Sequence, residues 1–89
     1  MIQVEIEITN ESGLHARPSS VLVKTASKFS SNIIIIKDGI EINGKSILGV
    51  MSIAAEKGSK IIIRIDGEDE KIAMDTLITL AQMGFKEQL

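Results

Sequence analysis

Apolar and polar residues alternate over residues 2–8, and this alternation predicts a β-strand. The segment IQVEIEI places Ile2, Val4, Ile6 and Ile8 on one face. Beyond residue 14 the apolar positions recur at helical spacing, which predicts an amphipathic helix over roughly 16–28. The positions that carry this period are Leu14, Pro18, Val21, Leu22 and Phe29.

The rest of the chain predicts a hairpin, a further strand and two further helices. The expected elements are strands over 33–37 and 40–42, a helix over 46–52, a strand over 60–66 and a helix over 70–84. Asp38-Gly39 joins the first two strands and supplies the positive φ values of a type I′ turn. The order β-α-β-β-α-β-α favours a two-layer α+β sandwich with its helices on one face of the sheet.

Composition indicates one small globular domain, 1–89. The 89 residues are 44% apolar and include no cysteine, which fits a reducing compartment. The first ten residues, MIQVEIEITN, lack the basic start of a signal peptide, and the longest aliphatic run, Ile33–Ile36, is too short to span a membrane. We therefore expect a soluble, cytoplasmic protein that does not insert into membranes.

Charge is unevenly distributed along the chain. The net charge is −2 and there is no Trp or Tyr, which argues against nucleic-acid binding. No acid lies between Glu11 and Asp38, and the basic residues of that stretch are Arg17, Lys24, Lys28 and Lys37. This locally basic region suits an anionic ligand or an acidic partner, although a chance run of solvated lysines would look the same.

The stretch GLHARPSS, at 13–20, contains the only histidine of the chain. Gly13 permits a sharp turn, and His15 is predicted to be the N-cap of the helix that follows. The backbone amides of Ala16 and Arg17 then have no helical acceptor, so they and the helix dipole form an anion site. Arg17 adds a guanidinium that matches phosphate geometry, which indicates a site for a phosphoryl group beside the imidazole.

Three other interpretations of His15 are possible. A lone histidine near a helix start is most often an ordinary surface residue. A metal site is disfavoured because one histidine without cysteine or a carboxylate pair cannot fill a coordination shell. A hydrolase is disfavoured because no carboxylate near the serines in sequence could orient the base.

GLHARPSS resembles the active-site signature, usually GLHARPA, of the HPr phosphocarriers of the bacterial phosphoenolpyruvate:sugar phosphotransferase system. NGKSILGVMSI at 43–53 and DGEDEKIA at 66–73 resemble two further family segments. The resemblance implies an open-faced sandwich, with a four-stranded antiparallel sheet and three helices on one face. Ser19, Ser20 and Gly44 depart from the usual pattern.

The resemblance implies that His15 accepts a phosphoryl group on Nδ1 from phosphorylated Enzyme I and passes it to the IIA domains of sugar permeases. Arg17 and the amides of Ala16 and Arg17 would hold the phosphoryl oxygens. The protein would be a phosphocarrier rather than a turnover enzyme, and it would need no cofactor or metal.

A docking surface is expected at the short helix over 46–52. Ile47, Leu48 and Met51 fall on a helix too short to bury every side, so we expect an apolar patch there rather than three core residues. The resemblance favours a contact role for the patch. Its polar and basic rim would be Ser20, Lys24 and Lys28. Such a surface fits transient contacts of a monomer with acidic partners.

Ser46 is predicted to be the N-cap of that short helix. The resemblance implies that it is also a regulatory phosphorylation site, modified by an HPr kinase/phosphorylase and then read by a catabolite-control transcription regulator. Three alternatives remain. One is a nitrogen-type paralogue that uses the same histidine in a regulatory phosphorelay. The others are a regulator that acts only through its serine, and a non-catalytic structural module.

Overall fold

The computed structural model describes residues 1–86, and these form four strands and three helices. The elements are β1 (Ile2–Glu7), α1 (Ala16–Ala26), β2 (Asn32–Lys37), β3 (Ile40–Asn43), α2 (Ile47–Ser52), β4 (Lys60–Asp66) and α3 (Glu70–Gln82). The strands form one sheet in the order β1-β4-β2-β3, and every neighbouring pair is antiparallel. The predicted order of elements and the predicted fold class are confirmed.

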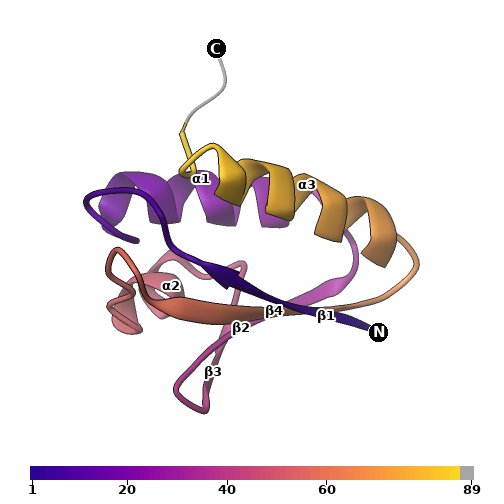
Figure 1. Ribbon diagram of the computed structural model, residues 1–89. Coiled ribbons are helices and arrows are strands. Elements are labelled where there is room, and N and C mark those ends of the chain that lie inside the picture. The colour runs from indigo at the N-terminus through magenta and orange to yellow at the C-terminus, as the bar shows by residue number, and fades with distance from the viewer. Residues whose placement is uncertain (87–89) are drawn as a thin grey trace.

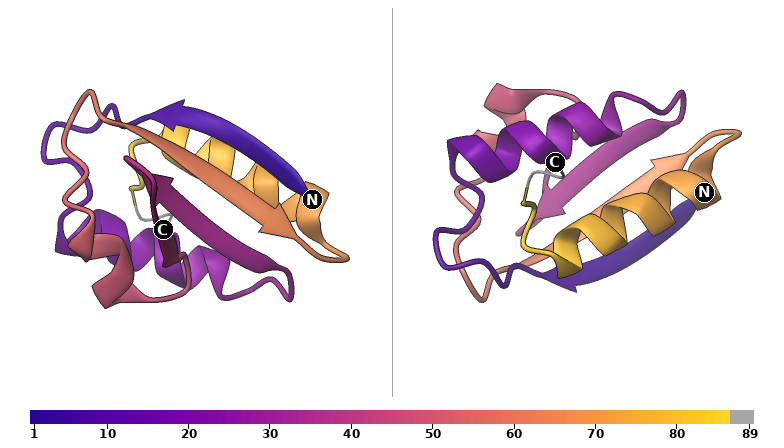
Figure 2. Two further views of the ribbon diagram at one scale, coloured as in Figure 1. Left: turned by 90° about the horizontal axis from the view of Figure 1, so that it is seen from below. Right: turned by 90° about the horizontal axis from the view of Figure 1, so that it is seen from above.

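The molecule has two layers. Helices α1 and α3 lie side by side across one face of the sheet, while the opposite face is open, and α2 lies at the end of the sheet where α1 begins (Figures 1 and 2). Within residues 1–86, no helix is long and apolar enough to cross a membrane.

Alternation along the strands builds the core. The isoleucines of β2 and β4 that face the helices are fully or almost fully buried: Ile33, Ile35, Ile61, Ile63 and Ile65. They pack with the inner faces of α1 and α3, among them Leu22, Ala26, Ala73 and Leu77. Ile34 and Ile62 point to the open face and are only half-buried. The strand pattern therefore places most, but not all, of the isoleucine side chains in the core.

Both long helices end two residues before the boundary that apolar spacing predicts. At the end of α1, Lys28 N donates to Thr25 O at 3.1 Å. This bond spans three residues, as in a 3₁₀ turn, whereas an α-helical bond spans four. At the end of α3, Gly84 N donates to Ala81 O and Phe85 N to Leu80 O. This pair of bonds is a Schellman motif, and the left-handed backbone of Gly84 (φ 69°) completes it.

Asp69 lies immediately before α3 and joins two loops that are far apart in sequence. Its carboxylate accepts hydrogen bonds from Ser30 N at 2.8 Å, from Ser31 N at 3.0 Å and from the Ser31 hydroxyl. Its side chain caps no amide of its own helix, although an acid at this position is typical of a helix start. The hydrogen bond from the Ser31 side chain, followed by that from Ser30 N, lowers the pKa of Asp69 to about 2.

This pKa predicts an acid-sensitive contribution to stability. The folded-state pKa of Asp69 lies below the ordinary value of 3.8, so its stabilisation is complete above pH 4 and is lost as the pH falls towards 2. We expect Asp69→Asn to lower the midpoint of thermal unfolding at pH 7, and the gap from wild type to narrow towards pH 2. Asp75→Asn, at an exposed position on α3, is the matched control. A gap that does not change with pH would contradict the assignment.

Candidate functional site

His15 lies at the start of α1 as its N-cap, as the sequence predicts. Its backbone is extended, and its carbonyl accepts the first helical hydrogen bond, from Ser19 N at 3.0 Å. The imidazole is exposed and makes no capping hydrogen bond to an amide of the helix. It therefore faces solvent and is accessible to a reacting partner.

Contacts to another loop hold the segment just before the helix. Gly13 has a φ of 66°, and a Cβ at this position would lie 2.4 Å from Ala55 O. Leu14 is buried, its amide donates to Ala55 O at 2.8 Å, and its carbonyl accepts from the buried Ser19 hydroxyl at 2.9 Å. The Asn10 side-chain amide also donates to Gly13 O. The contacts of Gly13 and Leu14 with Asn10, Ser19 and Ala55 thus fix the backbone immediately before His15.

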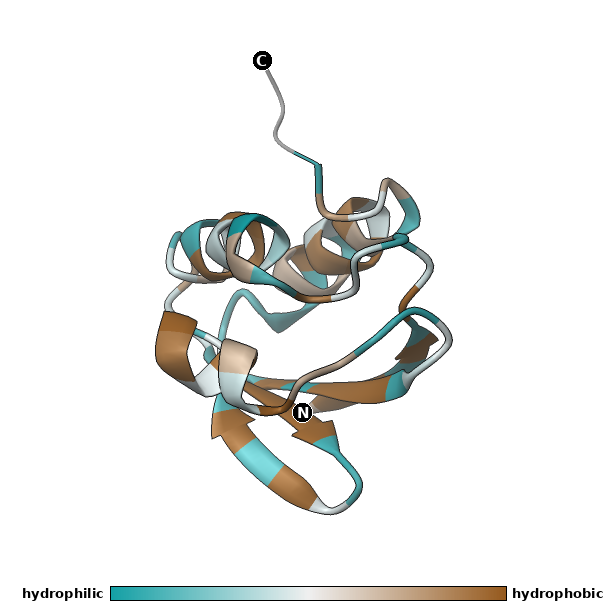
Figure 3. Cartoon of the chain, turned by 90° about the vertical axis from the view of Figure 1, so that its left-hand side faces the viewer, coloured by the Kyte–Doolittle hydropathy of each residue, from teal (hydrophilic) through white to brown (hydrophobic). Residues whose placement is uncertain are grey.

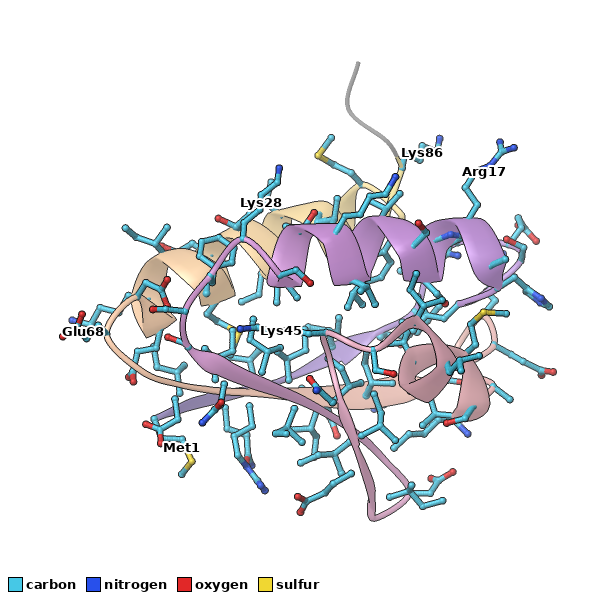
Figure 4. All side chains as sticks on the ribbon, turned by 180° about the vertical axis from the view of Figure 1, so that it is seen from behind. Met1, Arg17, Lys28, Lys45, Glu68 and Lys86 are labelled. Carbon is cyan, nitrogen blue, oxygen red and sulfur yellow. The ribbon has the colours of Figure 1, made fainter. Side chains whose placement is uncertain are left out.

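The first turn of α1 presents an anion site. Ala16 and Arg17 are its first two residues, so their amides have no acceptor within the helix. Pro18, at the third position, has no amide hydrogen to satisfy. The guanidinium of Arg17 projects into solvent from this end of α1 (Figure 4), and no ion pair to an acid holds it among residues 1–86. Free amides, the helix dipole and a cation therefore surround the imidazole.

An open hollow of roughly 1100 Å³ adjoins His15. It is lined by the loop between β1 and α1, by the first turn of α1 and by the segment after α3, which includes Lys86. The acid in its lining is Glu11, which is paired with Lys57 at 2.6 Å. The hydrogen bond from Lys57 lowers the pKa of the Glu11 carboxyl. The carboxylate is thus held ionised but paired, which leaves the hollow favourable to an anion.

The predicted apolar patch is exposed. Ile47, Leu48 and Met51 are 43%, 82% and 39% accessible, whereas Val50 of the same helix is buried. The possibility that all three belong to the core is therefore wrong. The apolar first turn of α2 is at the surface below α1 (Figure 3), and α2 lies at the end of the molecule where α1 begins.

The three residues predicted for the rim of the apolar patch lie at different distances along α1 from its first turn. Ser20 and Lys24 follow Arg17 along one face of α1, at the third and seventh positions after it. Lys28 lies beyond the last residue of α1, at the opposite end of the helix from Arg17 (Figure 4). Eleven residues separate the two, which corresponds to about 16 Å along a helix axis. Ser20 therefore lies about one turn and Lys24 about two turns from Arg17, whereas Lys28 lies past the far end of α1.

Ser46 caps α2, as the sequence predicts. Its hydroxyl accepts a hydrogen bond from Gly49 N at 3.0 Å. Lys45 extends away from α2 and donates to Phe29 O at 2.7 Å, which ties this turn to the end of α1. Gly44 is confined too, because a Cβ there would lie 2.7 Å from Ile33 Cγ2. This close approach gives a structural reason for glycine at position 44, one of the departures from the usual family pattern.

The site geometry agrees with comparisons to known sequences. Residues 2–82 match the family model for the PTS HPr component phosphorylation site. The chain is 49% identical over 87 residues to phosphocarrier protein HPr of Xylella fastidiosa, covering 98% of both. It is also 42% identical over 82 residues to the HPr-like protein Crh of Halalkalibacterium halodurans, covering 92% of this chain and 98% of that one.

Solved structures give the same result. The fold superposes on HPr-C-His of Thermoanaerobacter tengcongensis with a TM-score of 0.93 and 45% identity, covering 100% of both chains. A dimeric form of HPr from the same organism superposes with a TM-score of 0.78, covering 98% of this chain and 100% of that one. With its histidine at the cap of α1 and this agreement in sequence and fold, the chain belongs to the HPr phosphocarrier family of the phosphotransferase system.

Proposed function

We propose that the protein carries a phosphoryl group on Nδ1 of His15, accepting it from phosphorylated Enzyme I and delivering it to the IIA domains of sugar permeases. The observation that carries this proposal is the exposed imidazole at a helix N-cap, beside two amides without helical acceptors and the guanidinium of Arg17. A carrier needs an exposed acceptor nitrogen, because two different partners must reach it.

The transfer step follows from this arrangement. The lone pair of Nδ1 attacks phosphorus, a P–N bond forms, and the bond between phosphorus and the donor atom breaks, leaving its electron pair with the donor. The ring proton stays on Nε2. The amides of Ala16 and Arg17 and the Arg17 guanidinium stabilise charge on the three phosphoryl oxygens. Solvent exposure keeps this binding weak enough for the next partner to take the group.

Two substitutions test this chemistry. His15→Ala abolishes phosphoryl acceptance from Enzyme I and phosphoenolpyruvate, because the chain has no other histidine. Arg17→Ala slows transfer, on the order of 10²-fold as for other removed oxyanion donors, without changing the unfolding midpoint. Acid-labile, base-stable phosphate on the protein is the readout, and Arg64→Ala on the sheet is the control for loss of an arginine. Phosphate uptake by His15→Ala would refute the proposal.

The apolar patch and its basic rim serve as the docking surface for both partners. Ile47, Leu48 and Met51 supply an exposed apolar centre at one end of the molecule. Arg17 and Lys24 add positive charge on the adjoining helix α1 and complement acidic partner surfaces. An apolar centre with a charged rim gives a transient interface in which charge mainly sets the rate of association.

Lys24→Glu therefore weakens association with Enzyme I. We expect the KM for this protein as phosphoryl acceptor to rise severalfold at low salt and the difference to shrink in 0.5 M salt, because salt screens surface charge. Lys71→Glu, on the exposed side of α3, leaves KM unchanged and controls for net charge. An unchanged KM in Lys24→Glu at low salt would remove Lys24 from the interface.

Ser46 adds regulation through the same surface. A phosphate placed there by an HPr kinase/phosphorylase gains the free amides and dipole of α2, so the fold is kept. The added charge borders the apolar patch, repels acidic partners and offers a site to a catabolite-control transcription regulator. Support comes from the position of Ser46 as the cap of the helix that carries the patch.

Ser46→Asp separates the two roles of this serine. The mimic keeps the unfolding midpoint near wild type but slows phosphoryl transfer from Enzyme I to His15 by about tenfold or more, through repulsion at the interface. Ser46→Ala is the control: it loses the cap, at about 1 kcal/mol of stability, yet transfers at the normal rate. Normal transfer by Ser46→Asp would leave Ser46 with a capping role alone.

A further inference from the structure

Ser19 places a polar side chain in the core next to the site. It is the fourth residue of α1 and is fully buried, and with Ser31 it makes up the buried polar side chains of residues 1–86. It stands where the signature GLHARPA has alanine, so it is one of the departures from the usual family pattern. Burying a hydroxyl costs free energy unless it forms a hydrogen bond, so the partner of Ser19 indicates its role.

The hydroxyl of Ser19 donates to Leu14 O at 2.9 Å. Leu14 directly precedes the histidine and is itself buried. The residue four positions after Leu14 is Pro18, which has no amide hydrogen to offer to that carbonyl. The side chain of Ser19 thus supplies a donor that the backbone of Pro18 lacks.

Ser19 holds both peptide groups that flank His15. Its amide donates to His15 O at 3.0 Å, and its hydroxyl donates to Leu14 O. A peptide group is planar, so fixing a carbonyl also fixes the amide of the next residue. The bond to His15 O sets the direction of the Ala16 amide, and the bond to Leu14 O sets that of the His15 amide. Together the two bonds restrain φ and ψ of His15, which are −77° and −169°.

These two dihedral angles determine where the imidazole lies relative to the anion site. The Cα–Cβ bond of His15 starts between the two restrained peptide groups, so its direction relative to the amides of Ala16 and Arg17 is fixed before a partner arrives. Phosphoryl transfer is sensitive to this alignment, because the phosphoryl group must meet Nδ1 and the amides at the same time. A hydrogen bond between buried groups suits this purpose, since it is stronger there than in water.

We propose that Ser19 is a positioning residue for phosphoryl transfer, whose hydroxyl fixes the peptide group before His15 and thereby aligns the imidazole with the helix amides. This inference rests on the proposed phosphocarrier function and extends it. Any residue except proline could supply the amide of position 19, so the hydroxyl is what this sequence adds. An alanine there would leave the carbonyl of Leu14 without this donor.

The test compares two buried serines. Ser19→Ala removes the bond to Leu14 O and introduces the smaller residue of the usual signature. Ser31→Ala is the matched control, because it removes a buried hydroxyl that donates to Asp69, in the connection beyond the opposite end of α1 (Figure 1). In single-turnover transfer from phosphorylated Enzyme I, we expect Ser19→Ala to lower the rate at saturation about fivefold, as the loss of one neutral hydrogen bond predicts. The concentration that gives half the maximal rate stays unchanged, since the apolar patch is intact, and Ser31→Ala keeps both values.

A second measurement needs no partner protein. Phosphoramidate transfers its phosphoryl group to His15 as the P–N bond of the reagent breaks and ammonia leaves. The amide proton resonance of Ala16 should then move downfield as the amide donates to a phosphoryl oxygen. We expect this shift to be smaller in Ser19→Ala than in the wild type or in Ser31→Ala. Thermal unfolding shows that each variant is folded.

A wild-type rate at saturation in Ser19→Ala, or an equal fall in Ser31→Ala, would overturn the role of Ser19 alone. An Ala16 shift of wild-type size in Ser19→Ala would do the same. Failure of wild-type His15 to take phosphate from either donor would overturn the phosphocarrier proposal, and this inference with it.

Discussion

The backbone contact between Gly13-Leu14 and Ala55 is the constraint on which the site depends. A side chain at Gly13 would overlap Ala55 O, and the same oxygen accepts the Leu14 amide at 2.8 Å. The turn that presents His15 is therefore built against the connection between α2 and β4. Ala54, in a left-handed conformation with φ of 49°, lies in that connection. This contact thus fixes the turn before α1 against the connection that follows α2.

Local patterns in the sequence predict most of the fold because the helices and strands are amphipathic and the turns between them contain characteristic residues such as Asp-Gly. The hairpin at Asp38-Gly39 has the predicted positive φ values, 51° and 80°. The ends of the helices are less well predicted. The spacing of apolar residues does not show where α-helical hydrogen bonds give way to those of a 3₁₀ turn or a Schellman motif. Asp69 shows a further limit. Its acidity suggests a helix start, but its three hydrogen bonds go to a loop 38 residues or more away.

The same distinction holds at the candidate site. The places of His15, Ala16, Arg17 and Ser46 at the starts of α1 and α2 are predicted from sequence because a helix N-terminus is a local structure with local signals. The positions of Lys28 and Lys86 relative to the histidine are not predicted, because charges counted along a chain carry no information about direction in space. The α1 helix carries Lys28 away from the histidine, whereas the Schellman turn after α3 brings Lys86 towards it. Only tertiary structure distinguishes these two lysines.

The direction of α2 bears on how Ser46 could control His15. Lys45 ties the start of α2 to Phe29 O, beyond the end of α1, while the far end of α2 leads to Ala55 and the histidine turn. The six residues of α2 span about 9 Å, close to the distance over which salt screens exposed charges. Salt therefore weakens the effect of a phosphate on Ser46 at the far end of its own helix. The apolar patch of Ile47, Leu48 and Met51 begins immediately after Ser46 on the same helix, so the proposed regulation by Ser46 acts through the partner that covers this patch.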